Sequence, residues 1–170
     1  PLVTTLVKGE EFCLALPGYQ YTFPRDHAAH PDFRTEWWYF TGHLEGKKPQ
    51  DTFGYELTFF RTALQVKSKT KNSAWSLRDL YFAHFAISDL RSRSFWYAEK
   101  ISRGALGLAG ADPKKLKVWL EDWSLQENKG EGWTLNAKAD GRTLQLQLLP
   151  QKSEIIHGLE GVSQKADGAG

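Results

Sequence analysis

A chain of 170 residues is long enough to bury one hydrophobic core and short for two. Hydrophobic residues make up 41% and charged residues 25%, which is typical of a globular protein rather than a disordered one. The formal charge of +2 gives no field that would favour nucleic acid, and no apolar run approaches the roughly 20 residues of a membrane span. We therefore expect one domain without a nucleic-acid partner or a transmembrane segment.

Aromatic residues reach 14% of the chain, more than a core alone requires, so some of them need a further use. Cys13 is the only cysteine, which excludes an intramolecular disulfide and a cysteine-based zinc site. We interpret it as an incidental thiol. Because the sequence starts with Pro and contains no Met, we expect a piece of a longer protein whose targeting segment is missing.

Alternating apolar and polar residues, separated by Gly, Pro, Asn and Asp, predict about eight strands. They cover Tyr19–Phe23, Glu36–Leu44, Phe53–Leu64, Leu80–Ser88, Phe95–Ile101, Leu116–Leu125, Trp133–Ala139 and Arg142–Leu148. The last two form the clearest hairpin, because Asp140-Gly141 suits a tight two-residue turn. We expect an all-β, mostly antiparallel meander, closed or nearly closed into a barrel that can hold one small ligand.

Two connections read as irregular: Ser102–Lys115 holds three Gly and a Pro, and Lys67–Ser73 is a polar, basic run typical of a solvated loop. If Leu116–Leu125 is one strand, it carries large side chains on both faces. Leu116, Val118 and Leu120 then oppose Trp119, Trp123 and Leu125. Such a strand needs cover on both sides, and the second cover would lie outside this chain.

The densest group of chemically active residues lies between Phe23 and His43. Pro24 and Pro31 disfavour a regular helix between them, so acidic, basic and imidazole groups occupy a loop that leads into an aromatic strand. Alternation places Glu36, Trp38 and Phe40 on one face of that strand, and Trp37, Tyr39, Thr41 and His43 on the other. This pattern indicates the mouth of a cavity.

The run Pro-Arg-Asp-His-x-x-His-Pro-Asp-Phe-Arg-Thr-Glu-Trp-Trp-Tyr resembles the carotenoid 1,2-hydratase-like family, also called AttH-like. The resemblance continues through Phe53–Arg61, Ala83–Phe85, Ser102–Leu108, Val118–Trp123 and Gly161–Lys165. It implies a lipocalin-like (calycin-type) β-barrel, export to the periplasm or secretion, a hydrophobic ligand, and a protein of about twice this length with a second barrel. Accordingly, residues 1–22 would be an N-terminal segment with the first strand, 23–165 the amino-terminal barrel and 166–170 a flexible tail.

Two functions follow from the resemblance: a carrier of a lipid or isoprenoid, which we favour, and a hydro-lyase that adds water to an alkene. The lyase needs an acid whose pKa is raised by burial, and Asp26, Glu36 and Glu56 are its candidates. Glu36 would lie at the cavity mouth beside Trp38, with Glu56 contributed by the following strand. The simpler alternative is that Glu36 pairs with Arg34 or Arg61 and that the aromatic residues belong to the core.

Ligand contacts are expected from the imidazoles, the aromatic strand and one arginine. The set comprises His27, His30, Trp37, Trp38, Tyr39, Tyr55, Arg61 and His84, of which His84 also suits a core position. His27 and His30 with Asp26 and Glu36 offer metal donors, but no helix sets the imidazoles on one face, so we expect no metal and no cofactor. The absence of a Gly-x-Ser-x-Gly motif disfavours covalent hydrolysis.

Overall fold

The computed structural model describes residues 12–64, 77–128, 132–158 and 160–163, which form two antiparallel sheets of four and five strands. The elements are the 3-10 helix η1 (Arg25–His27) and the strands β1 (Thr35–Glu45), β2 (Thr52–Ala63), β3 (Asp79–Asp89), β4 (Ser94–Arg103), β5 (Ala109–Ala111), β6 (Lys117–Leu120), β7 (Trp123–Glu127), β8 (Trp133–Ala139) and β9 (Arg142–Leu148). The expected loop at Lys67–Ser73 and the tail at 166–170 lie outside the described residues.

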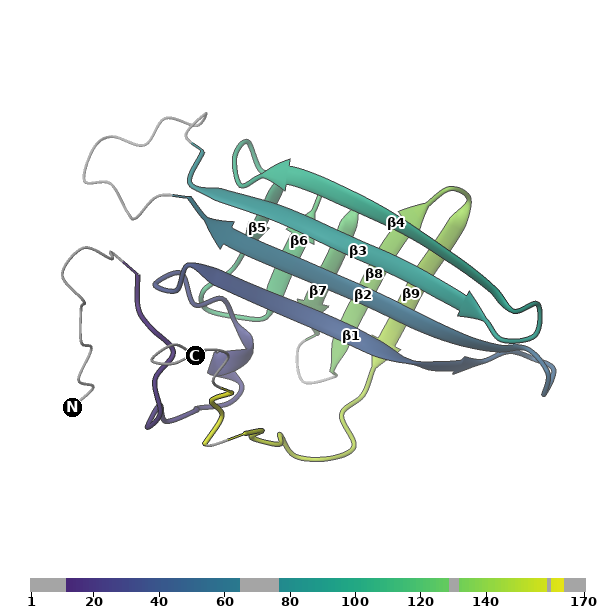
Figure 1. Ribbon diagram of the computed structural model, residues 1–170, viewed down its shortest axis with the longest axis horizontal. Helices are drawn as coiled ribbons and strands as arrows, with labels where there is room; N and C mark the ends of the chain where they lie inside the picture. The colour runs from purple at the N-terminus through teal and green to yellow at the C-terminus, as the bar shows by residue number, and fades with distance from the viewer. Residues whose placement is uncertain (1–11, 65–76, 129–131, 159, 164–170) are drawn as a thin grey trace.

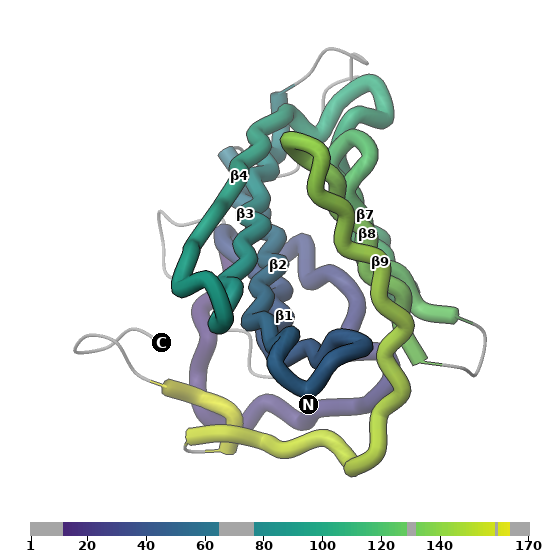
Figure 2. The backbone as a smooth tube through the Cα atoms, turned by 90° about the vertical axis from the view of Figure 1, so that its right-hand side faces the viewer, coloured from purple at the N-terminus to yellow at the C-terminus, as the bar shows by residue number. Residues whose placement is uncertain are grey.

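The two sheets lie face to face, and their strands cross rather than run alongside each other. Figure 1 shows β1–β4 in front of β5–β9. In Figure 2 the sheets approach each other near the end of β4, and the purple N-terminal segment and the yellow C-terminal segment pass across the opposite side. Crossed packing of this kind encloses one core between the two inner faces.

The core consists of apolar side chains from both inner faces. Phe85 of β3 meets Trp123 of β7 edge to face, with ring centres 5.8 Å apart, so an aromatic contact joins the sheets. The largest fully buried side chains are Trp123, Phe59, Phe85, Leu57, Leu120, Leu125, Leu135 and Val118.

The alternation predicted for β1 is confirmed. Glu36, Trp38 and Phe40 are half-buried on the inner side, whereas Trp37 and Tyr39 are exposed on the outer side. The hairpin of β8 and β9 also forms as predicted, and both residues of its Asp140-Gly141 turn adopt positive φ angles, of 48° and 75°.

The prediction of one strand over Leu116–Leu125 is wrong, because a tight turn at Glu121-Asp122 divides it into β6 and β7. Glu121 adopts a φ angle of +56°, and Leu120 then faces Trp123 across the hairpin. Leu120 and Trp123 therefore point into the same core, not to opposite faces. Lys100 of β4 holds the turn through ion pairs to both Glu121 and Asp122.

The strand predicted over Tyr19–Phe23 does not form. Backbone groups that would have joined a sheet are used locally instead: the Thr22 amide donates to the Asp26 carboxylate at 2.6 Å, and the Asp26 amide donates to the Thr22 carbonyl at 3.0 Å. An Asp side chain that takes a nearby amide in this way favours a turn over a strand.

The all-β, mostly antiparallel fold is confirmed and is compatible with a lipocalin-like arrangement, but the barrel is not closed. Among the described residues no strand pairing joins β4 to β5 or β9 to β1. The segment before β1 contacts the five-stranded sheet instead: the Ala29 amide donates to the Asp112 carbonyl, just after β5, at 3.0 Å, and the His27 ring lies 5.3 Å from Trp133 of β8. Contacts of this segment, not strand pairing, thus join the β1 side of the molecule to the five-stranded sheet.

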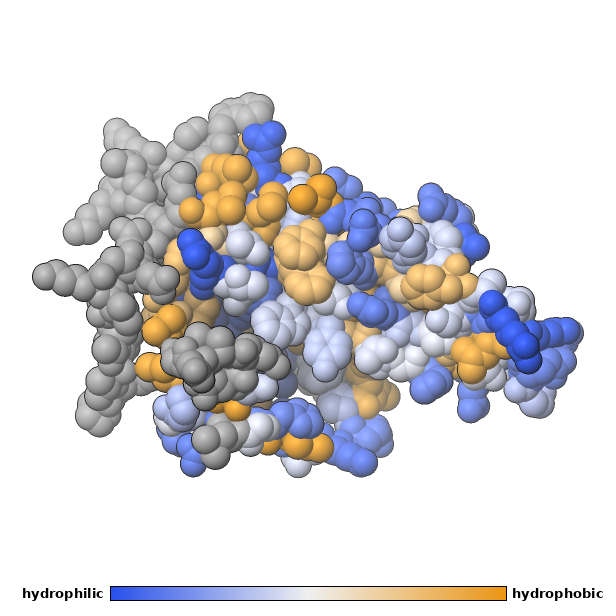
Figure 3. Space-filling model, viewed as in Figure 1, coloured by the Kyte–Doolittle hydropathy of each residue, from blue (hydrophilic) through white to orange (hydrophobic). Residues whose placement is uncertain are grey.

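The outer face of the four-stranded sheet carries exposed aromatic and apolar side chains (Figure 3). Trp37 lies beside Phe60, Phe60 beside Phe82 and Phe82 beside Ile101, so one row of apolar residues crosses all four strands. The Phe60 and Phe82 rings stack at 4.6 Å. Cover for this face, expected from the sequence, stays a prediction. No helix in the described part of the chain is long and apolar enough to cross a membrane.

Replacing Trp123 by Ala should lower the free energy of unfolding by about 3–5 kcal/mol, because the side chain is fully buried in the core. Trp37→Ala is the matched control: Trp37 is 55% exposed on the outer face, so its loss should cost less than about 1 kcal/mol. Urea denaturation of both variants measures the difference. Equal losses would mean that Trp123 does not face the core.

Candidate functional site

The loop between η1 and β1 brings its charged side chains together beside the first sheet. Its shape depends on Asp26, whose carboxylate accepts hydrogen bonds from the Thr22 amide at 2.6 Å and the Tyr19 hydroxyl at 3.0 Å and pairs with Arg25 at 2.6 Å. Ala28 and Ala29, which follow η1, are buried. Small side chains there let the loop lie close against the sheets.

His30 lies between two carboxylates. Its Nδ1 is 2.7 Å from Oε1 of Glu36, and its Nε2 is 3.4 Å from Oδ1 of Asp26. The backbone amide of His30 also donates to both Glu36 oxygens, at 2.9 and 3.0 Å. Glu36 therefore fixes both the ring and the backbone of His30.

Arg61 of β2 completes the network from the neighbouring strand. Its side chain is only 3% exposed and donates to Glu36 at 3.4 Å and to Asp79 of β3 at 3.1 Å. The same guanidinium donates to the carbonyls of His30 at 3.0 Å and Phe33 at 2.7 Å. A buried charge is tolerated only with such complete pairing, and here the pairing anchors the loop to β1, β2 and β3.

A cavity of about 390 Å³ lies beside this network. It borders five consecutive residues of β1, Glu36–Phe40, so it runs along the edge of the strand that does not pair with β2. Trp133 of β8 closes it from the second sheet, with its ring 6.1 Å from Phe40 and 5.3 Å from His27. The full lining is Asp26, His27, Ala28, His30, Glu36, Trp37, Trp38, Tyr39, Phe40, Leu116 and Trp133.

The electrostatics of the network favour charged forms. Burial alone would raise the pKa of Asp26, but hydrogen bonds from Thr22, Arg25, Tyr19 and His30 outweigh it and lower that pKa. The hydrogen bond to Glu36 is the main cause of the raised pKa of His30, against burial, which acts in the opposite direction. At neutral pH Asp26 is therefore a carboxylate and cannot act as an acid.

Many of the residues predicted from sequence do meet at this cavity. Asp26, His27, His30, Glu36, Trp37, Trp38 and Tyr39 all border it. Of the two arginines that the sequence offered as partners of Glu36, Arg61 forms the ion pair. Trp38 in addition donates from Nε1 to the His27 carbonyl at 3.2 Å, which fixes the indole against the loop.

Other predicted residues lie elsewhere, and the expected approach of Glu36 and Glu56 to one cavity is wrong. In β2 the odd-numbered Tyr55, Leu57, Phe59 and Arg61 are buried on the inner side, so Glu56 is exposed on the outer side, where it accepts from the Thr58 hydroxyl at 2.9 Å. His84 shares that outer side and pairs with Glu99 at 3.4 Å. Tyr55 belongs to the core and does not border the cavity.

Sequence reasoning missed Leu116 and Trp133 as lining residues and Asp79 as a partner of Arg61. All three come from elements distant in sequence from the Phe23–His43 run, so only the packing of the sheets shows their role. His27 likewise meets Glu154 at 3.3 Å. In the described part of the chain, no three His, Cys, Asp or Glu side chains are arranged to hold a metal ion.

Comparison with known proteins places this arrangement in a family. The AttH-like family model matches residues 14–170. The chain belongs to the AttH-like family. A solved structure from Nitrosomonas europaea, named as an AttH candidate, is 32% identical to this AttH-like chain with a TM-score of 0.77, over 93% of this chain. The match spans 46% of the Nitrosomonas chain, so this chain has about half its length. No curated protein matches the sequence.

Arg61→Gln should lower the free energy of unfolding of this AttH-like chain by about 3–5 kcal/mol, because it leaves Glu36 and Asp79 without their buried partner. Arg91→Gln makes the same change in an exposed pair with Asp51 and should cost less than about 1 kcal/mol. Denaturant titration compares the two. A loss of similar size in both would show that the Arg61 network does not hold the loop.

Stability should fall as the pH rises above about 6.5 and through the raised pKa of His30. The pKa of His30 is raised above 6.5, so its protonated form stabilises the fold at low pH and that contribution is lost as pH passes the raised pKa. His30→Gln should remove this part of the pH dependence, up to about 1 kcal/mol. His43→Gln, on the exposed side of β1, is the control that should retain it. Urea midpoints across the pH range would contradict the assignment if both variants behaved alike.

Proposed function

We propose that this chain binds an apolar small molecule, a lipid or isoprenoid, in the cavity beside β1. The observation that carries the proposal is the cavity of about 390 Å³ framed by Trp38, Phe40 and Trp133, within the size range of small-molecule sites. Leu116 adds an aliphatic contact from the second sheet. The indole of Trp38 and the ring of Trp133 have other contacts that fix their positions, so the apolar walls exist before a ligand arrives.

Binding, not hydration, is the function that the geometry supports best. An alkene hydratase needs a carboxylic acid that keeps its proton and faces the ligand. Here Asp26 is held ionised, Glu36 is engaged by Arg61 and His30, and Glu56 is on the outer side of the sheet. The charges at the cavity are thus satisfied by each other, which suits a fixed wall rather than a proton donor.

We further propose that the whole protein is exported and that a second barrel covers the aromatic outer face of the four-stranded sheet. Two observations support the second barrel: the Nitrosomonas relative continues for about as long again as the matched part, and Trp37, Tyr39 and Ile101 are exposed on one face. Exposed apolar patches of this kind mark interaction surfaces. Export is supported by the family resemblance alone.

Trp38→Ala should weaken binding of farnesene, an acyclic apolar alkene, by about 1–3 kcal/mol, because the indole forms a wall of the cavity. Tyr97→Ala, an aromatic loss on the outer face of β4, should leave the affinity unchanged. Titration by tryptophan fluorescence measures both. Equal affinity of Trp38→Ala and wild type would place the ligand elsewhere.

Mass spectrometry of organic extracts after incubation with farnesene distinguishes carrier from enzyme. Recovery of unchanged farnesene is expected. A product heavier by one water would overturn the carrier proposal in favour of hydration, if the Glu36→Gln variant no longer forms that product. The circular dichroism spectrum of the variant should match that of the wild type, which shows that the variant is folded.

A further inference from the structure

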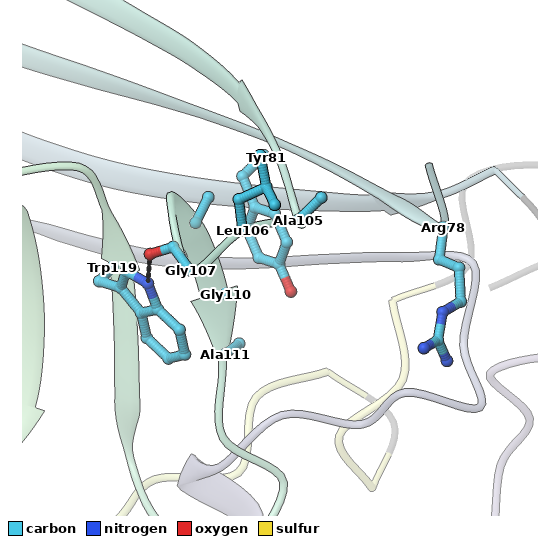
Figure 4. Close-up of a pocket in the computed structure, with 10 residues that line it drawn as sticks. Arg78, Tyr81, Ala105, Leu106, Gly107, Gly110, Ala111 and Trp119 are labelled. Atoms are coloured by element: carbon cyan, nitrogen blue, oxygen red, sulfur yellow. Dashed lines mark hydrogen bonds between the residues drawn. The ribbon is translucent and has the colours of Figure 1, made fainter. Parts of the chain in front are cut away.

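A second cavity, of about 340 Å³, lies at the other side of the Arg61 network, between the start of β3 and β5 (Figure 4). Tyr81 of β3 and Arg78, which directly precedes β3, border it on one side, and Trp119 of β6 borders it from the second sheet. The segment that connects β4 to β5 supplies the rest of the wall. The full lining is Arg78, Tyr81, Gly104, Ala105, Leu106, Gly107, Ala109, Gly110, Ala111 and Trp119.

Small residues let two aromatic side chains frame this cavity. A Cβ atom at Gly110 would overlap the Trp119 ring, so glycine allows the indole to lie flat on β5. Trp119 is held there because its Nε1 donates to the Gly107 carbonyl at 3.0 Å, as Figure 4 shows. At Gly104 a Cβ atom would come within 2.9 Å of the Tyr81 ring. The positions of both rings are therefore fixed by packing.

Two hydrogen-bond donors that border the cavity donate to no acceptor among the described residues. The Tyr81 side chain is buried, and burial raises the pKa of its hydroxyl, which keeps the proton in place at any physiological pH. That hydroxyl donates to no described residue; the Ala111 amide instead donates toward it. The Arg78 guanidinium makes no hydrogen bond or ion pair with any described residue, although the Arg78 carbonyl accepts from the Leu64 amide just beyond the end of β2.

We propose that this second cavity binds a molecule with a carboxylate head and an apolar body. The carboxylate would accept from the Arg78 guanidinium and the Tyr81 hydroxyl, and the apolar body would lie against Leu106, Ala109 and the Trp119 ring. A carboxylate accepts from both guanidinium and hydroxyl donors, and hydrogen bonds to a charged acceptor are the strong ones. Leu106 is exposed at the rim, where the apolar body would cover it.

This site is distinct from the cavity beside β1. Glu36, Arg61 and Tyr81 occupy consecutive strands in one row across the inner face, with Glu36 at the first cavity and Tyr81 at the second. Arg61 and its partners lie between them. The two cavities also differ in chemistry, because the cations of the first are already paired, whereas Arg78 has no described partner.

Isothermal titration with decanoate and with decanol, its uncharged counterpart, tests the proposal on the intact chain. Decanoate should bind more tightly than decanol. Arg78→Gln should weaken decanoate binding about tenfold or more, as expected for the loss of a hydrogen bond to a charged group, and leave decanol binding unchanged. Tyr81→Phe retains the ring that packs on Gly104, so it should keep the fold and weaken decanoate binding several-fold.

Arg103→Gln is the matched control, because it removes the same charge from an exposed residue at the end of β4 that does not border the cavity. It should leave decanoate affinity within twofold of wild type. Equal affinities of wild type for decanoate and decanol would overturn the proposal, as would equal effects of Arg78→Gln and Arg103→Gln. Trp38→Ala should not change decanoate affinity, so failure here and failure of farnesene binding at the first cavity are separate results.

Discussion

The buried guanidinium of Arg61 is the interaction on which the arrangement of this molecule depends. A charge that is only 3% exposed requires several hydrogen-bond partners, and Arg61 finds them on three different elements. Glu36 comes from β1, Asp79 from β3, and two carbonyls come from the loop before β1. The loop is therefore held in place, because its carbonyl groups at His30 and Phe33 accept hydrogen bonds from the buried guanidinium.

From this constraint follow the two cavities. Anchoring the loop at Arg61 accompanies the contact of His27 with Trp133 and of Trp38 with the His27 carbonyl, and these residues border the cavity beside β1. On the other side of the same row, Tyr81 faces the short strand β5, where glycine and alanine leave room. The row of Glu36, Arg61 and Tyr81 thus lies between the two cavities. The charged groups at the first cavity pair with each other, whereas the Arg78 guanidinium at the second has no described partner. The two ligands proposed for these cavities accordingly differ in chemistry.

Sequence patterns predicted the strands and turns well where neighbouring residues alone determine the backbone conformation. The alternation of β1 and the Asp140-Gly141 turn depend on nearest neighbours, and both are confirmed. The turn at Glu121-Asp122 escaped prediction because the residue at positive φ is Glu121, a type that does not usually favour that conformation, and its support, Lys100, comes from the other sheet. The wrong placement of Glu56 has another origin. The apolar residues Tyr55, Leu57 and Phe59 alternate with Glu56 in the sequence, and this alternation already indicated that Glu56 points away from the inner side. The roles of Trp133 at the cavity and of Asp79 as a partner of Arg61 depend on how distant strands pack together, which no local sequence pattern shows.

The meander topology has a consequence for the order in which the structure is made and lost. Every strand pairs only with its neighbours in the chain, so both sheets can form from local hairpins at low cost in loop-closure entropy. The contacts of the N-terminal segment are of another kind: the Tyr21 hydroxyl donates to the Gly161 carbonyl across 140 residues, and His27 meets Glu154 across 127. Because contacts this distant in the chain cost more loop-closure entropy, we expect them to form after the sheets, so weakening them should speed unfolding more than it slows folding. On this expectation, the N-terminal segment affects how long the native molecule persists rather than how quickly it is reached.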